Sequence, residues 1–433
     1  MHAIFRSKLA TVITAALLLT LEIGVSVSSG QDTAMADSIR VSVVAGAMQN
    51  VMSEIVERYQ EANPGVTVTL ELEPEGGTFQ ALIAAGNQPD MIITSFGPQL
   101  GAIAAQGAAA ELEELPGAQD LFGRIEPRSV EQLYGHNYYV PIGADVTMMI
   151  YNKALFEEAG LDPDSPPQTW ADFLAAAEAI QGLPARENGD PVYGTVFWNE
   201  ALQWGGWYWN MLQPIYLNSN QSSCQLLNTL GTDIVFDRED CQLGSFFEFV
   251  QAAQQFAPAT MEKNFFSRDI GMWLQYGYSW EPNLREALDS PMVIGDDVGV
   301  APIPVPNEGD TSYTTFGGRA AMILKTSPER EARAWDFVQF MMQDENNLQF
   351  LQELGYLPLL TSLQSDPYFQ EAARKPFVDA LQNGVLPEQF ATADQAAVAL
   401  QGIYQQAVVD GSIPLADAVT DAAEAAREAL QGQ

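Results

Sequence analysis

Residues 138–170 read YYVPIGADVTMMIYNKALFEEAGLDPDSPPQTW and decide the fold of this 433-residue chain. They hold two β-prone runs, 138–140 and 146–151, on either side of the small residues 143–145. Pro141 closes the first run, because proline has no amide proton to donate to a sheet. The second run is largely apolar, which is typical of a strand buried on both faces. The stretch therefore predicts two short strands with a crossing between two bodies.

Two helices are expected to follow the crossing. Residues 153–159 have helical composition, and Gly160 is suited to end that helix. Thr169 stands three residues before Asp172, which is the spacing of a capping box. The next helix is therefore predicted to begin at Trp170.

The region before the crossing alternates between strand and helix patterns. A β-α-β-α-β-α order of this kind predicts a parallel, doubly wound sheet, in which ligands bind beyond the carboxyl ends of the strands. Here those ends are residues 46–49 and 95–97. The expected strands are 39–45, 66–72 and 90–94, and the expected helices are 48–62, 79–85 and 99–106.

The first residues are typical of a secretory signal peptide. A charged start is followed by an apolar run at 9–21, which is short for a membrane span. The sequence Ala34-Met35-Ala36 predicts a signal peptide over residues 1–36, with cleavage near Ser29 or an uncleaved anchor as the alternatives. Because no cysteine lies near either site, we expect a soluble protein, periplasmic or extracellular, without a lipid anchor.

Charge and residue usage exclude several functions. A net charge of −37 repels phosphate backbones, which argues against nucleic acid as a partner. After cleavage His136 would be the one remaining histidine, and motifs such as HExxH, GxGxxG and the Walker A loop are absent from the sequence. Cys224 and Cys241 fit one disulfide in an exported chain, with two free buried thiols as the alternative. We expect no cofactor and no metal.

The stretch MIYNKALFEEAGLD…PPQTWADFLAAAEAI at residues 149–180 resembles the strand-crossing segment of the family 1 extracellular solute-binding proteins of ABC importers. Further resemblances are AAGNQPDMII at 84–93, the run at 265–280, the helix at 329–342 and Tyr356-Leu357-Pro358. The resemblance implies an α/β, periplasmic-binding-protein-like fold: two doubly wound lobes, a multi-segment hinge and a ligand cleft between the lobes. We expect residues 37–144 plus 297–318 in lobe 1, and residues 145–296 plus 319–433 in lobe 2.

The predicted ligand-binding residues lie at strand ends, at the crossings and in the aromatic segments. Indole rings suit the C–H faces of a pyranose, and polar side chains pair with its hydroxyl groups. Trp280 is the first choice for stacking because the family's tryptophan there faces the cleft. Three of these residues have alternative interpretations. Asp145 could be a hinge residue, Arg319 could form an ion pair on the surface, and Trp280 could belong to the core. The full set is Gln49, Ser95, Phe96, Asp145, Trp204, Trp207, Trp280, Gly318, Arg319 and Tyr356.

The resemblance implies a monomeric receptor that closes on a solute, most often a mono- or oligosaccharide, and delivers it to an ABC permease. Two alternatives stay open. One is a receptor for a non-sugar solute such as a polyamine, a betaine or a glycerophosphodiester, since an aromatic cage can hold a cation. The other is a secreted glycosidase, with Glu281 or Asp145 paired to a second carboxylate. No acid, base or nucleophile is evident, so we expect the protein not to be an enzyme.

Overall fold

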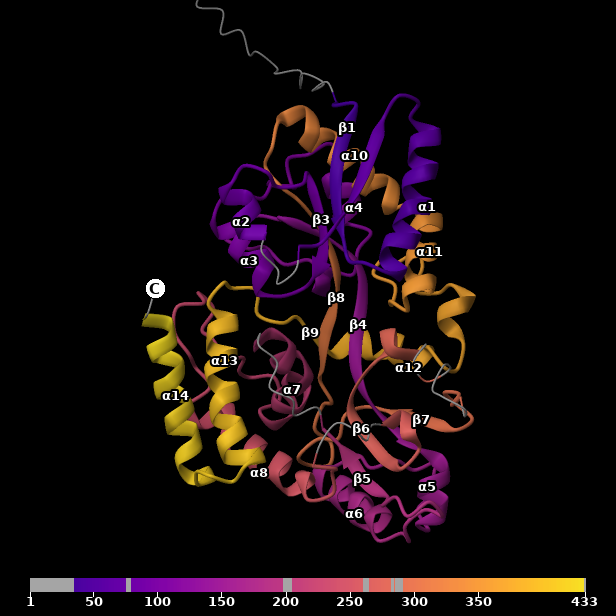
Figure 1. The fold of residues 1–433 in the computed structure, drawn as a ribbon, viewed down its shortest axis with the longest axis vertical. Helices are drawn as coiled ribbons and strands as arrows, with labels where there is room; N and C mark the ends of the chain where they lie inside the picture. Colours follow the sequence, from indigo (N-terminus) through magenta and orange to yellow (C-terminus); the bar gives the residue numbers. More distant parts are fainter. Residues whose placement is uncertain are drawn as a thin grey trace, which may run out of the picture.

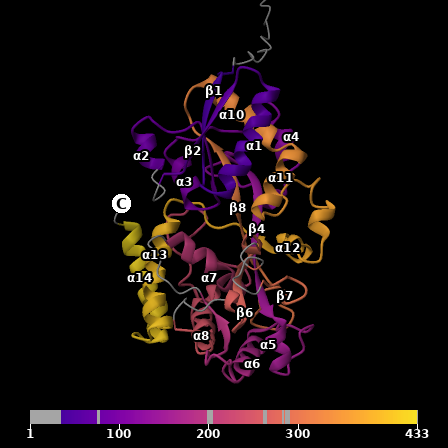
Figure 2. The same cartoon turned by 45° about the vertical axis from the view of Figure 1, so that its right-hand side comes forward.

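The computed structural model describes residues 35–74, 79–197, 205–259, 265–281, 284 and 291–431, and the side chains of 205–210 and of Trp280 are not described. Two lobes lie one above the other in Figure 1, and two long strands run through both of them. The second view shows the same two-lobed shape (Figure 2). Nearly all of the expected signal peptide, residues 1–36, lies outside the described part of the chain.

The upper lobe begins with the predicted parallel strands. β1 (Ser38–Val43) pairs in parallel with both β2 (Thr67–Leu72) and β3 (Met91–Ser95). Between them lie α1 (Ala47–Ala62) and α2 (Phe79–Ala84), and α3 (Pro98–Ala105) and α4 (Ala118–Phe122) follow. The apolar stripe of α1 is buried as its periodicity requires, with Val51, Ile55 and Tyr59 at most 1% exposed. The order predicted from the sequence is therefore confirmed.

The crossing is one strand rather than two. β4 (Tyr139–Asn152) runs without interruption from one lobe into the other. Its first half pairs antiparallel with β8 (Thr314–Ile323), and its second half pairs with β6 (Ile270–Gly277) and β7 (Val298–Ala301). Pro141 was expected to end the first strand. The strand continues because the β8 register shifts between Pro141 and Gly143, so the missing amide falls at an irregularity of the ladder.

The sheet path follows the order β2-β1-β3-β8-β4-β6-β5, with β5 at Tyr193–Val196, and β9 (Gly384–Val385) pairs with β8. Helices cover the lower lobe (Figure 1). The capping box of Thr169 and Asp172 is present, with the Asp172 amide donating to Thr169 Oγ1 at 3.2 Å. The lower helices are α5 (Lys153–Glu158), α6 (Trp170–Gln181), α7 (Gly205–Ser219), α8 (Leu243–Gln254), α13 (Ala393–Tyr404) and α14 (Leu415–Gln431).

The return segments divide between the lobes differently from our expectation. β7, expected in lobe 1, pairs with residues 149–152 of β4 in the lower lobe. α10 (Pro328–Met341) and α11 (Asp344–Leu354), expected in lobe 2, pack on β1 and α1 of the upper lobe. The physical reason is that β8 runs back into the upper lobe, so the helices that follow it cover the upper sheet. α12 (Lys375–Ala380) then contacts β4.

The lower lobe has a hydrophobic core of its own, and a disulfide lies in that core. Buried residues of α6, α8, α13 and α14 form a separate hydrophobic cluster around Phe173, Phe247 and Tyr404. The predicted disulfide is present between Cys224 and Cys241, and both cysteines belong to this cluster. It therefore fastens the connection between α7 and α8 to the lower core.

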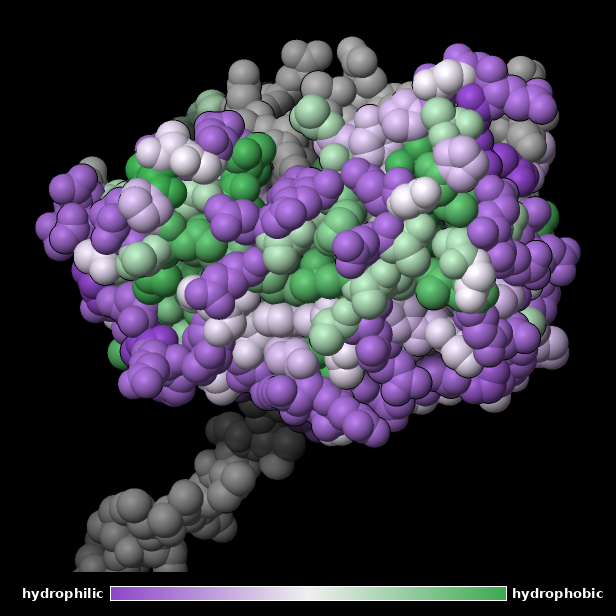
Figure 3. Space-filling view, turned by 90° about the horizontal axis from the view of Figure 1, so that it is seen from below, coloured by the Kyte–Doolittle hydropathy of each residue, from purple (hydrophilic) through white to green (hydrophobic). Residues whose placement is uncertain are grey.

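Seen from below, the lower end of the molecule exposes both hydrophobic and hydrophilic residues. Hydrophobic residues form a broken band across the middle of this face, bordered by hydrophilic ones (Figure 3). A shallow hollow of about 500 Å³ lies on this lobe, lined in part by Phe156, Asp162, Pro167 and Glu308. Among the residues that the structure describes, no helix is long and apolar enough to cross a membrane.

Candidate functional site

A cavity of about 200 Å³ lies where β4 and β8 pass from one lobe to the other. Its walls come from both lobes: Ser95 ends β3 of the upper lobe and Phe96 follows it, whereas Met211 and Gln275 belong to α7 and β6 of the lower lobe. It is thus a cleft between the lobes. The lining residues are Ser95, Phe96, Asp145, Thr147, Met211, Gln275, Gly277, Ser279, Thr315, Gly317, Gly318, Arg319, Tyr356 and Pro387.

Six of the ten residues that we predicted from the sequence line this cavity: Ser95, Phe96, Asp145, Gly318, Arg319 and Tyr356. Gln49 is not among its lining residues and lies partly exposed near the start of α1. Trp204 falls outside the described residues. Trp207 and Trp280 are placed by their backbone alone: Trp207 precedes Met211 by about one helical turn, and Trp280 follows Ser279 directly.

Arg319 is the basic group among the lining residues, and both of its polar contacts are made inside the cavity. Its Nη1 donates to Ser95 Oγ at 2.8 Å, and its Nε donates to the Tyr356 hydroxyl at 2.8 Å. The register Ser95↔Arg319 fixes this arrangement, because it sets the end of β3 beside β8. Burial raises the pKa of nearby Glu73, and the positive charge of Arg319 partly opposes that rise. The guanidinium is held in place by two hydroxyl oxygens, that of Ser95 at the end of β3 and that of Tyr356 just after α11.

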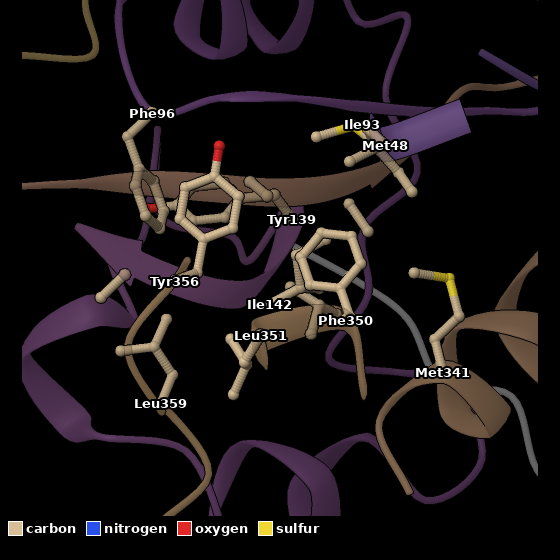
Figure 4. Close-up of a cluster of buried hydrophobic side chains, with 14 of the residues drawn as sticks. Met48, Ile93, Phe96, Tyr139, Ile142, Met341, Phe350, Leu351, Tyr356 and Leu359 are labelled. Atoms are coloured by element: carbon tan, nitrogen blue, oxygen red, sulfur yellow. The ribbon is translucent and has the colours of Figure 1, made fainter. Parts of the chain in front are cut away.

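Tyr356 forms an aromatic wall of the site. Its ring stacks on Phe350, with ring centroids 6.0 Å apart and planes 16° apart. Phe96 and Tyr139 lie beside it in the close-up, and the Tyr356 hydroxyl points away from the hydrophobic residues below (Figure 4). Tyr356 is 9% exposed, so packing fixes the ring and leaves the hydroxyl for Arg319.

Asp145 is a partly buried carboxylate at the crossing itself. Ser279 Oγ donates to its Oδ2 at 2.5 Å, whereas its Oδ1 is buried and has no hydrogen-bond partner within the described ranges. Burial raises the pKa of Asp145 to about 6, against the opposing effect of hydrogen bonds from Ser279 and backbone amides. A buried acceptor without a partner costs free energy, so a donor group of a bound solute would be stabilised here.

Glycines let the two crossing strands approach each other. Gly318 has φ +133°, and a Cβ built there would stand 2.1 Å from the carbonyl oxygen of Gly143 on the paired strand. A Cβ on Gly277 would lie 2.7 Å from Asp145 Oδ2. Larger side chains at these positions would displace the strands or fill the site.

Several lining residues were missed by sequence reasoning. They are Thr147, Met211, Gln275, Gly277, Ser279, Thr315 and Pro387, whereas Gly317 was expected, together with Gly318, to allow close approach of the backbone to a ligand. Thr147 and Gln275 lie within runs that are otherwise apolar, and an isolated polar residue in such a run was the available signal. Glu73 directly follows β2, so the strand-end argument that gave Ser95 applies to it as well.

Known proteins share this architecture. A family model described as bacterial extracellular solute-binding protein matches residues 45–348. The chain is 24% identical over 419 residues to a protein of Brucella abortus whose name identifies it only as a binding protein, which covers 92% of this chain and 96% of the relative. It is 23% identical over 325 residues to the maltotriose-binding protein of Pyrococcus abyssi, which covers 73% of this chain and 65% of the relative.

The fold agrees with these relatives. The cyclic alpha-maltosyl-1,6-maltose binding protein from Arthrobacter globiformis superposes with a TM-score of 0.77 at 21% identity, over 92% of this chain and 99% of that one. Two α/β lobes with a cleft at their crossing strands define a periplasmic-type binding protein. The chain belongs to the family of bacterial extracellular solute-binding proteins, whose members serve transport rather than catalysis.

We predict that the unliganded protein loses stability as pH rises from about 4 to about 7. Burial raises the pKa of Asp145 to about 6 and that of Glu388 to about 7. Both values exceed those of the unfolded chain, roughly 4, so the folded state holds protons that the unfolded state releases in this window. The contribution of each group to stability is therefore greatest below the window and falls by about 3 kcal/mol across it, or by about 6 kcal/mol for the two groups together. Urea unfolding at a series of pH values measures this change in the free energy of unfolding.

Asp145→Asn provides the control, because the amide oxygen still accepts from Ser279 without a charge. The variant should exceed the parent in free energy of unfolding above pH 6, and the difference should shrink towards pH 4. A difference that is the same at every pH would contradict the buried-carboxyl explanation.

Proposed function

We propose that the protein is the extracytoplasmic receptor of an ABC importer and that its cargo is a mono- or oligosaccharide. The observation that carries this proposal is the cleft at the strand crossing, where a fixed guanidinium, an unpartnered carboxylate oxygen and an aromatic wall converge. Hydroxyl groups of a sugar both donate and accept hydrogen bonds, so they match Asp145 and Arg319 together. The names of the Pyrococcus and Arthrobacter proteins, which refer to maltose-type sugars, add support.

Nine of the ten predicted residues have a direct contact with the sugar in this proposal. Asp145 accepts from a sugar hydroxyl, Arg319 and Ser95 bind a neighbouring one, and Tyr356 with Phe96 borders the ring. Trp204, Trp207 and Trp280 are proposed to stack on the pyranose faces, as indoles do. Gln49 is proposed as a contact that lies at the rim of the cleft and reaches a longer oligosaccharide.

Closure of the two lobes would couple binding to delivery. A solute that contacts both lobes stabilises the closed form, and by linkage the closed form binds that solute more tightly. We propose that the closed, monomeric receptor then docks on the permease subunits. No proton transfer or covalent step is required.

Thermal unfolding against a panel of solutes tests the proposal. The panel contains maltose, maltotriose and other mono- and oligosaccharides, together with putrescine, glycine betaine and glycerol 3-phosphate. A solute present at about 100 times its dissociation constant adds roughly 2.7 kcal/mol, so one saccharide should raise the unfolding temperature by a few degrees.

The other outcomes separate the alternatives. If only an amine, a betaine or a glycerophosphate raises the unfolding temperature, the protein is still a solute receptor, but its cargo is not a sugar. Release of a reducing end from an oligosaccharide would overturn the transport function in favour of a glycosidase.

A further inference from the structure

We propose that the upper lobe carries a binding site for Zn²⁺ formed by Glu111, Glu113 and His136. Their ligand atoms all lie within 4.8 Å of one another. His136 Nδ1 is 2.5 Å from Glu113 Oε1 and 3.6 Å from Glu111 Oε2. A tetrahedral zinc ion with ligands at about 2.0 Å separates them by roughly 3.3 Å, so small side-chain rotations would suffice to coordinate it.

The backbone arranges these three groups. Glu111 and Glu113 stand two residues apart where the chain enters a turn at 113–114, and a carboxylate oxygen of each approaches His136 Nδ1. The Leu112 amide donates to the Asn137 carbonyl at 2.8 Å, and this bond sets His136 beside both carboxylates. The Asn137 amide also donates to Glu113 Oε2 at 3.1 Å, which orients that carboxylate and leaves Oε1 toward the imidazole. An outer hydrogen bond that fixes a ligand in this way is a regular feature of metal sites.

A simple ion pair accounts for the cluster less completely. A proton on Nδ1 is shared with one carboxylate at a time, and the second carboxylate, Glu111, has only the distant ammonium group of Lys325 at 3.9 Å beside it. A divalent ion would contact all three groups and neutralise both charges. Imidazole nitrogen with carboxylate oxygen favours zinc, whereas Ca²⁺ and Mg²⁺ prefer oxygen ligands throughout. The net charge of −37 also draws cations to this protein.

The site is remote from the sugar cleft. Lys325, which lies 3.9 Å from Glu111, follows the end of β8, whereas Arg319 of the cleft lies at the other end of the same pairing with β3. Six residues of extended chain separate them by roughly 20 Å. Zinc binding here would fasten residues 111–113 to the turn before β4 without contact with the solute.

Calorimetric titration of the metal-free protein with Zn²⁺, in excess Mg²⁺ to occupy unspecific carboxylates, tests the site. We expect one equivalent to bind, and Co²⁺ in its place to show the visible absorption of a nitrogen- and oxygen-coordinated ion. Glu111→Gln and His136→Gln should each weaken binding by about tenfold or more. Lys325→Gln should tighten it, because a competing cation is removed.

Glu114→Gln is the matched control: it removes the same charge from the neighbouring exposed residue and should leave the affinity unchanged. Absence of binding by the parent protein would overturn the site. Equal affinity of the parent and His136→Gln, or equal losses in Glu111→Gln and Glu114→Gln, would also overturn it.

Discussion

Arg319→Gln should weaken binding of the saccharide that stabilises the protein by roughly 10- to 150-fold. The guanidinium lies in the cleft and makes both of its polar contacts there, with Ser95 and Tyr356. A hydrogen bond from a charged donor contributes about 1.5–3 kcal/mol, and glutamine supplies neither the charge nor the fork geometry. Titration calorimetry of the parent and the variant with that saccharide measures the change in affinity.

The matched control is Arg124→Gln. Arg124 is half exposed and faces Asp344 at 3.9 Å, and it is not among the residues that line the cleft. The same loss of charge there should leave the affinity unchanged. If Arg319→Gln binds as tightly as the parent protein, then the arginine is a structural brace for Ser95 and Tyr356 and not a solute contact.

Gly318→Ala should cost more than about 3 kcal/mol of folding stability, or prevent folding altogether. The added Cβ would stand 2.1 Å from the Gly143 carbonyl oxygen and 2.8 Å from the Cα of Ala144, both of which are backbone atoms. The backbone φ of +133° is also one that alanine rarely adopts. Since these atoms belong to the paired strands β4 and β8, relief of the clash would require the strands to separate. Urea unfolding measures the loss.

Two further glycine-to-alanine substitutions serve as controls for this prediction. Gly317→Ala is the neighbouring change, and its Cβ would lie in ordinary contact, 3.6 Å from the carbonyl oxygen of Asp145. Gly402→Ala changes an exposed position of α13 with open space around it and should stabilise the protein by about 0.5–1 kcal/mol. If Gly318→Ala were no less stable than Gly317→Ala, the close approach of the strands would not matter to the fold.

Much of the fold was predictable because local patterns carried it. The stripe of Val51, Ile55 and Tyr59 gave α1, and the spacing of Thr169 and Asp172 gave the start of α6. These signals depend on neighbours within a few residues, which a single sequence contains in full. The continuity of β4 through Pro141 was not predictable in this way, because it depends on a register shift against β8, which lies more than 170 residues further along.

The residues of the candidate site also fall into two groups, those that local patterns predict and those that depend on long-range pairing. Ser95 and Phe96 could be placed from the rule for strand ends, and Arg319 from its position at a predicted crossing. Thr147 and Gln275 could not, because the face of β4 and β6 that meets the cleft is set by long-range pairing. Gln49 was assigned from the same rule as Ser95, yet α1 has already begun at Ala47. The assignment of α10 and α11 to the lower lobe failed because the sequence does not show that β8 returns to the upper sheet.

The order of strands has a consequence for how the chain is made. β8 lies between β3 and β4 in the sheet, although it follows β4 in the sequence by more than 160 residues. A growing chain that ends before residue 323 therefore lacks the strand that joins the upper sheet to the crossing. Non-local pairing of this kind also folds slowly. The upper sheet can thus be completed only after residue 323 has been synthesised, and the lower core must also wait for α13 and α14.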